Sequence, residues 1–145
     1  MRRIALAGVA MLAVAACTQT APGVSRAAEQ TVVVPGAIPG TSQQAVVSGE
    51  MNTLRVPVQG NTAPRHDLYI RVNGQPAVQG TLVTYGATTL QGYAGTMPVT
   101  AVCQSRELAK ADRQFDCNIT LNNRQTVPMS FRATPTGPQQ PVDRS

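Results

Sequence analysis

Residues 67–82, DLYIRVNGQPAVQGTL, decide the fold of this chain. Leu68, Ile70 and Val72 alternate with polar or half-polar neighbours up to Asn73-Gly74, and a second apolar run follows. A period of two is typical of a strand with one buried face. Asn-Gly favours a two-residue type I′ turn, because both turn positions need positive φ. The stretch therefore predicts a β-hairpin.

Residues 116–131, DCNITLNNRQTVPMSF, predict a second hairpin around Asn122-Asn123. Aligned at a spacing of 49, the two stretches share Asp, Ile, Asn and Val. Upstream, a spacing of 43 matches Gly49 with Gly92, and matching pairs of Thr and Val follow at positions 53/96 and 56/99. The pattern favours a duplicated four-strand unit. Two unrelated hairpins built from the same residue types would also align after a search over registers.

The rest of residues 31–132 also has the pattern of strands and turns. Short runs rich in Val, Thr, Leu and Ile are separated by Gly, Pro and Asn. Residues 32–34 and 54–58 read as strands, with Pro57 indicating an edge position. We expect an all-β fold, a small antiparallel β-sandwich or barrel of about seven to eight strands. One short helix is expected at residues 105–111, capped by Ser105.

The N-terminus has the pattern of an export signal. Arg2 and Arg3 precede an uncharged apolar run at residues 4–16, which is shorter than the ~20 residues that a membrane-spanning helix needs. The run ends in Val14-Ala15-Ala16-Cys17 and resembles the lipobox of bacterial lipoproteins. This resemblance implies cleavage before Cys17, lipid on its thiol, and anchoring by acyl chains such as palmitate. An ordinary secretory signal that happens to precede a cysteine is the alternative.

The resemblance also implies a location and a domain organisation. Many Gram-negative lipoproteins kept at the inner membrane have aspartate after the lipidated cysteine, whereas this chain has Thr18. The outer membrane, on its periplasmic face, is therefore favoured. The expected organisation is a signal peptide at 1–16, the lipidated cysteine and a flexible tether at 17–30, a β-domain at 31–132, and a disordered tail at 133–145.

Composition argues against several classes of function. Of the 12 Lys and Arg residues two leave with the signal, which lowers the net charge from +5 to +3, and aromatic residues make up 3% of the chain. Nucleic-acid binding therefore has little support. The remaining cysteines, Cys103 and Cys117, are expected to form a disulfide in an oxidising compartment. The alternative is a pair of metal ligands, but with His66 as the only histidine we predict no metal and no cofactor.

No residue pattern predicts an enzyme. His66 beside Asp67 is the only candidate base, and it reads as an exposed histidine in a loop. Glu107, Asp112 and Asp116 lie among basic residues, so local salt bridges explain them better than acid–base catalysis. The three tyrosines can gather on one face for ligand stacking, but they are more often residues at the core edge; they are Tyr69, Tyr85 and Tyr93.

The sequence thus predicts a non-enzymatic lipoprotein that acts as an interaction or assembly module in the cell envelope. We expect it to contact the membrane through lipid on Cys17 and to bind an envelope protein, with exposed strand edges and the Cys103–Cys117 loop as contact surfaces. The alternative is a lipoprotein inhibitor or ligand-binding protein, for example of a hydrolase, that uses the Cys103–Cys117 loop.

Overall fold

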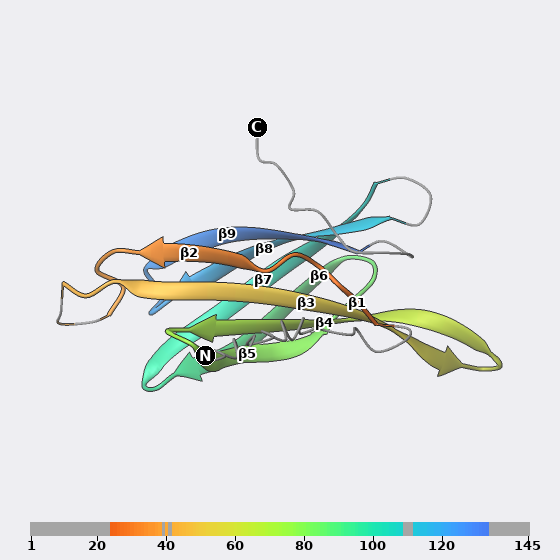
Figure 1. Cartoon of the computed structure of the whole chain (residues 1–145), viewed down its shortest axis with the longest axis horizontal. Helices are drawn as coiled ribbons and strands as arrows, with labels where there is room; N and C mark the ends of the chain where they lie inside the picture. The colour runs from red at the N-terminus through yellow and green to blue at the C-terminus, as the bar shows by residue number, and fades with distance from the viewer. Residues whose placement is uncertain (1–23, 39, 41, 109–111, 134–145) are drawn as a thin grey trace, which may run out of the picture.

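The fold is all-β and antiparallel, as the sequence predicts (Figure 1). The computed structural model describes residues 24–38, 40, 42–108 and 112–133. Its strands are β1 (Val24–Arg26), β2 (Gln30–Val34), β3 (Ala45–Val58), β4 (Asn61–Val72), β5 (Gln75–Leu82), β6 (Ala87–Ala94), β7 (Met97–Glu107), β8 (Arg113–Leu121) and β9 (Gln125–Ala133). The described part contains no helix, and so none with the length and hydrophobicity to cross a bilayer.

The nine strands of the described residues form a five-stranded sheet and a four-stranded sheet. In the first sheet β3 pairs with β4 and β4 with β5, while β1 and β2 both pair with the remaining edge of β3. These two short strands are therefore halves of one interrupted strand. The second sheet has the order β6-β7-β8-β9. Each sheet is a meander, in which neighbours in sequence are neighbours in space, and the turn between β5 and β6 connects the two.

Both predicted hairpins are confirmed. β4 and β5 meet at Asn73 and Gly74, with φ of 51° and 79°, and β8 and β9 meet at Asn122 and Asn123, with φ of 49° and 56°. Asparagine tolerates this left-handed region better than other non-glycine residues. The side chain of Asn73 also accepts a hydrogen bond of 2.8 Å from the amide of Val46, which joins the first turn to the start of β3.

Two boundaries differ from the predicted organisation. The predicted tether at 17–30 is wrong for residues 24–30, because β1 pairs with Asn52–Leu54 of β3 and Ala27 is buried in the core. The amide of Ala27 also donates a hydrogen bond of 2.9 Å to the carbonyl of Met51. At the other end β9 runs to Ala133. The predicted signal peptide, Cys17 and residues 134–145 lie outside the described residues.

The predicted helix at 105–111 is wrong. Ser105, Arg106 and Glu107 are the last residues of β7 and pair with Phe115, Gln114 and Arg113 of β8. Cross-strand pairing that continues from the disulfide overrides the helix propensity of this short segment. Residues 109–111 lie outside the described part of the chain.

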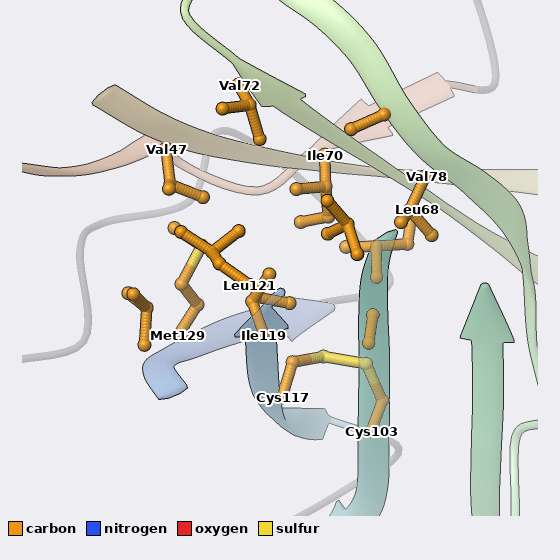
Figure 2. Close-up of a cluster of buried hydrophobic side chains, with 14 of the residues drawn as sticks. Val47, Leu68, Ile70, Val72, Val78, Cys103, Cys117, Ile119, Leu121 and Met129 are labelled. Atoms are coloured by element: carbon orange, nitrogen blue, oxygen red, sulfur yellow. A yellow bond between two sulfur atoms is a disulfide. The ribbon is translucent and has the colours of Figure 1, made fainter. Parts of the chain in front are cut away.

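The core fills the space between the two sheets (Figure 2). Its largest fully buried side chains come from both sheets, among them Phe115, Phe131, Met51, Leu68, Ile70, Ile119, Leu121 and Met129. Gly49 of β3 makes room for the second sheet: a Cβ there would lie 2.6 Å from Met129 Sδ and 2.7 Å from Phe131 Cζ. The predicted disulfide between Cys103 and Cys117 is present and lies inside this core.

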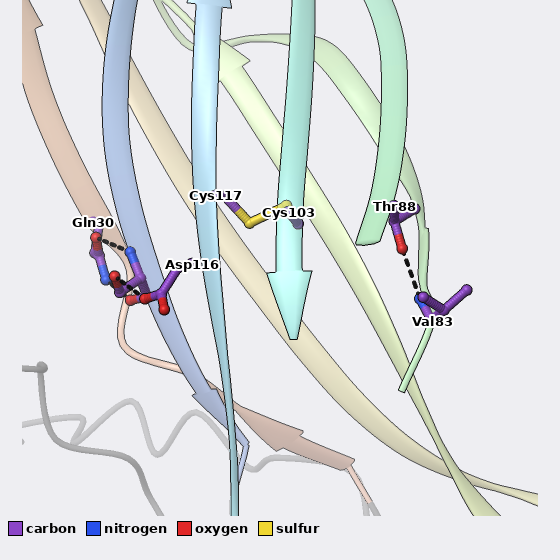
Figure 3. The surroundings of a disulfide bond; sticks show 7 residues. Gln30, Val83, Thr88, Cys103, Asp116 and Cys117 are labelled. Atoms are coloured by element: carbon purple, nitrogen blue, oxygen red, sulfur yellow. Dashed lines mark hydrogen bonds between the residues drawn. A yellow bond between two sulfur atoms is a disulfide. The ribbon is translucent and has the colours of Figure 1, made fainter. Parts of the chain in front are cut away.

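The sheets meet along two seams, and among the described residues neither seam has a backbone ladder. At the β5–β6 seam Gly92 approaches the backbone of Ala77 so closely that a Cβ would be 1.9 Å from the Ala77 carbonyl oxygen. At the β2–β9 seam the side-chain amide of Gln30 forms the pair of backbone hydrogen bonds that a neighbouring strand would otherwise form. Its Oε1 accepts a hydrogen bond of 3.1 Å from Ser130 N–H, and its Nε2 donates to the Ser130 carbonyl. The fold is therefore a sandwich whose β2–β9 seam is closed by side-chain hydrogen bonds. Figure 3 shows Gln30 on one side of the disulfide.

The two sheets repeat the same arrangement. Residues of β4–β5 and β8–β9 correspond at the predicted spacing of 49, because Val72 faces Val47 across the ladder as Leu121 faces Val99. The predicted upstream match at a spacing of 43 is wrong: it aligns Gly49 of β3 with Gly92 of β6. The ladder registers instead make β7 the equivalent of β3, at a spacing of 52 residues.

At a spacing of 52 the Met51–Leu68 pair of the first sheet corresponds to the Cys103–Cys117 pair of the second. The disulfide thus occupies the place of an apolar pair. A polar contact repeats as well. Asp67 accepts a hydrogen bond from the Thr81 hydroxyl, and Asp116 accepts one from the Ser130 hydroxyl, both at 2.8 Å. This correspondence supports the duplication that the sequence predicts.

The hairpin of β3 and β4 extends beyond its sheet as a two-stranded ribbon. β1 pairs with β3 only as far as Leu54, and β5 pairs with β4 only as far as His66. Beyond these residues β3 and β4 have no other strand partner in the described part of the chain, and they pair with each other through Arg55/Pro64, Val56/Ala63, Pro57/Thr62 and Val58/Asn61. We call these eight residues and the Gln59-Gly60 turn the ribbon. Figure 1 shows it projecting from one end of the sandwich.

Candidate functional site

His66 is buried in β4 and does not lie in an exposed loop, which corrects the prediction from sequence. Only 2% of its surface is exposed. Its Nδ1 shares a hydrogen bond of 2.9 Å with the Thr53 hydroxyl, and its ring packs on Phe115 with 4.6 Å between ring centroids. Its Nε2 is buried and has no hydrogen-bond partner among the described residues.

The surroundings of His66 keep its imidazole neutral at pH 7. The pKa of His66 is lowered from 6.5 to about 4, mainly by burial and also by the positive charge of Arg113, while Asp67 acts in the opposite direction. Desolvation dominates because the charged form of the ring loses its hydration inside the sandwich.

Asp67 does not orient His66. Adjacent residues of a strand point to opposite faces, and the Asp67 carboxylate lies on the other side of β4. There it accepts hydrogen bonds from Arg65 at 2.9 and 3.1 Å and from Thr81 at 2.8 Å. The structure thus brings a hydroxyl to the only histidine but does not bring the carboxylate that would complete a nucleophile–base–acid relay.

Arg113 covers the end of the sandwich next to His66. It is buried, and its guanidinium carbon lies 4.2 Å from the centroid of the Tyr85 ring. Such a cation–π contact supplies an attraction of about 0.5–2 kcal/mol. Among the described residues no carboxylate forms an ion pair with Arg113. The buried guanidinium of Arg113 therefore contacts the ring of Tyr85, where a buried arginine more commonly contacts a carboxylate.

The loop that carries Tyr85 is held against β7. Gly86 N–H donates to the Ser105 hydroxyl at 3.0 Å, and Ser105 N–H donates back to the Gly86 carbonyl at 2.9 Å. On the same loop, Val83 N–H donates to the Thr88 hydroxyl at 2.9 Å, as Figure 3 shows. These contacts fix the connection between the two sheets at the end where the ribbon begins.

We call Thr53, His66, Tyr85, Arg113 and Phe115 the His66–Arg113 cluster. Sequence reasoning singled out His66 and Tyr85 separately, and it missed Thr53, Arg113 and Phe115. The spacing of 49 could have identified Phe115, because it is the equivalent of His66 in the second hairpin. Arg113 precedes Phe115 by two residues and shares its face of β8.

The remaining candidates are distributed over the surface. Asp116 forms a salt bridge of 3.7 Å with Arg106, one of the neighbouring basic residues expected to pair with it. Asp112 pairs instead with Arg132 of β9 at 2.8 Å. The tyrosines do not gather on one face. Tyr69 lies on the outer face of the first sheet, Tyr85 on the loop, and Tyr93 on the outer face of the second sheet.

Metal ligands are not grouped in the described part of the chain, where no three His, Cys, Asp or Glu side chains come together. The cysteines face each other directly across β7 and β8 and are joined as a disulfide, so the alternative of a cysteine metal site does not hold.

No protein family, curated protein or solved structure matches this chain.

Proposed function

We propose that this protein is an outer-membrane-anchored lipoprotein that acts as a non-enzymatic interaction or assembly module of the cell envelope. The lipobox-like run ending at Cys17 supports the anchor. The Cys103–Cys117 disulfide agrees with an exported protein, because disulfides persist in oxidising compartments. The buried, neutral imidazole of His66 supports a function that involves binding only.

The ribbon is the observation that carries the proposal. A two-stranded ribbon is only marginally stable in water, and this one has no third strand beside it among the described residues. Val56 and Val58 lie on one of its faces, in line with Leu54 just before the ribbon, and Val58 is 47% exposed. An envelope partner that covers this face would bury apolar surface that the monomer leaves in water.

Proline favours side-chain contacts over an added strand. Pro57 and Pro64 stand on the two strands of the ribbon and have no N–H to donate to a neighbouring chain. Proline on an edge is a common defence against strand addition. We therefore expect the partner to pack on the apolar face of the ribbon.

Site-specific photo-crosslinking in cells tests this contact. A crosslinker at Val58 should give one discrete adduct with an envelope protein, and Val56→Glu should abolish it. A matched probe at Asn123, an exposed turn residue of the other hairpin, should give no such adduct. The absence of an adduct at Val58, or the same adduct from both positions, would contradict the proposal.

The alternative is an inhibitor or ligand-binding protein that uses the loop closed by Cys103 and Cys117. It is supported by the extension of β7 past the end of β6, which pairs only as far as Gln104, and by the exposed Leu108 that follows. A crosslinker at Leu108 distinguishes the two functions. An adduct with a hydrolase at Leu108 and none at Val58 would favour the inhibitor.

A further inference from the structure

Away from Arg106, Asp116 and Arg132, the outer face of the second sheet is uncharged. The side chains of this part alternate along β6–β9 with those of the core, and they are exposed or half-buried. We call the following residues the uncharged face: Thr89, Gln91, Tyr93, Pro98, Thr100, Val102, Gln104, Asn118, Thr120, Thr126 and Pro128. Threonine, amide side chains, proline, one valine and one tyrosine make up this surface.

The outer face of the first sheet differs sharply from it. Glu50 lies there between Arg26 and Arg71, at 3.7 and 3.5 Å, and Arg65 pairs with Asp67. On the second sheet the ion pairs among the described residues are Arg106–Asp116 and Arg132–Asp112, toward one end of the sheet. The uncharged face therefore offers no ion-pair partner to an acidic or phosphate-bearing polymer, and electrostatic complementarity favours a neutral ligand.

The ladder registers arrange the polar groups of this face in rows. Gln91, Thr100, Thr120 and Thr126 stand side by side across the four strands, with strands ~4.8 Å apart. The hydroxyls of Thr120 and Thr126 lie 3.1 Å apart and are hydrogen-bonded. Threonine is β-branched and has few rotamers, so ordering these side chains on a ligand costs little conformational entropy.

An exposed aromatic ring stands at one end of this array. Tyr93 is 65% exposed and lies directly opposite Pro98 in the β6–β7 ladder. Besides Tyr93, the only exposed large apolar side chain on this face is Val102. A protein interface normally has an apolar core of several such residues. Hydroxyls and amides that both donate and accept hydrogen bonds suit a ligand that is itself rich in hydroxyls.

We propose that the uncharged face binds one extended strand of a neutral polysaccharide. The Tyr93 ring packs on the apolar face of a sugar ring, and the threonine row and the amides of Gln91 and Asn118 hydrogen-bond to its hydroxyl groups. This surface is separate from the ribbon, so the inference does not depend on the proposed function.

Retention of the purified full chain on insoluble neutral polymers, chitin and cellulose, tests the inference. We expect retention on at least one of them that is unchanged between ~0.05 and ~0.5 M salt, because no ion pairs are involved. Retention on neither polymer would overturn the inference. So would retention that is lost at high salt.

Two variants locate the binding. Tyr93→Ala should weaken retention about fivefold, the loss of one stacking contact, and Thr126→Val, which keeps the shape but removes a hydroxyl, should weaken it as well. Tyr69→Ala is the matched control, because it removes a tyrosine on the outer face of the first sheet, outside the uncharged face, and should leave retention unchanged. Equal retention of Tyr93→Ala and the parent chain would overturn the inference, as would capture of a protein by this face in place of the polymer.

Discussion

The stability of the sandwich should depend on a single histidine. His66 is the only histidine in the chain. In the folded protein its pKa is lowered to about 4 by burial and by Arg113, whereas a histidine in the unfolded chain has its ordinary pKa of 6.5. The unfolded state therefore binds a proton that the folded state excludes between these two values. The contribution of His66 to the free energy of unfolding should have its full value above pH 6.5 and should decrease as the pH falls toward 4.

The expected loss follows from the gap between the two pKa values. At about 1.4 kcal/mol for each pH unit, lowering the pH from 7 to 4 should decrease the free energy of unfolding by ~3 kcal/mol through His66 alone. Urea denaturation at a series of pH values measures the total change. His66→Leu isolates the contribution of His66, because carboxylates that titrate in the same range remain in the variant and cancel in the difference.

The difference curve between the parent chain and His66→Leu should be flat above pH 6.5 and should change by ~3 kcal/mol below it. The NMR titration of the single imidazole should give a midpoint near 4. A midpoint near 6.5 would show that the ring is hydrated in the folded protein and would refute the burial argument. Parallel stability curves for the two chains would refute it equally.

Four further substitutions test the packing by urea denaturation. Cys103→Ala and Cys117→Ala should each lower the free energy of unfolding by ~3 kcal/mol, as expected for a loop of about 15 residues, and a double variant much worse than either single one would show that they do not act as one bridge. Gly49→Val should lower the free energy of unfolding by ~1–3 kcal/mol through overpacking, since even a Cβ would lie 2.6 Å from a core side chain. An unchanged free energy of unfolding would mean that the two sheets move apart without cost to make room for the side chain. Gln30→Leu should lower the free energy of unfolding by ~1–3 kcal/mol and speed hydrogen exchange of the Ser130 amide. Unchanged exchange would contradict the role of Gln30 in accepting a hydrogen bond from this amide.

Local patterns predicted the hairpins because turn chemistry and strand periodicity act within a few residues. Asn73-Gly74 and Asn122-Asn123 adopt the positive φ that their residue types favour, and the alternating apolar residues around them face the core. The disulfide followed from compartment and cysteine count. These features need no knowledge of how distant segments pack.

The errors occurred where long-range pairing overrides local preference. Residues 105–107 have helix-forming neighbours but continue the ladder opposite Phe115 and Arg113. Residues 24–30 have a tether-like composition, yet the edge of β3 requires backbone partners and residues 24–26 and 30 pair with it.

His66 shows the same limit within the candidate site. Its immediate neighbours are Arg65 and Asp67, which suggest exposure. Burial comes instead from Phe115, 49 residues away, which packs on the ring. The alignment of the two hairpins contained this contact, but only the ladder registers show that equivalent positions face each other across the sandwich.

Intact mass spectrometry of the protein extracted from membranes, with and without reduction and alkylation, tests the central claim most directly. An anchored and bridged envelope module predicts a chain that begins at Cys17 and carries acyl groups, with two thiols that react only after reduction. A chain without lipid, or free thiols at Cys103 and Cys117 before reduction, would contradict the account.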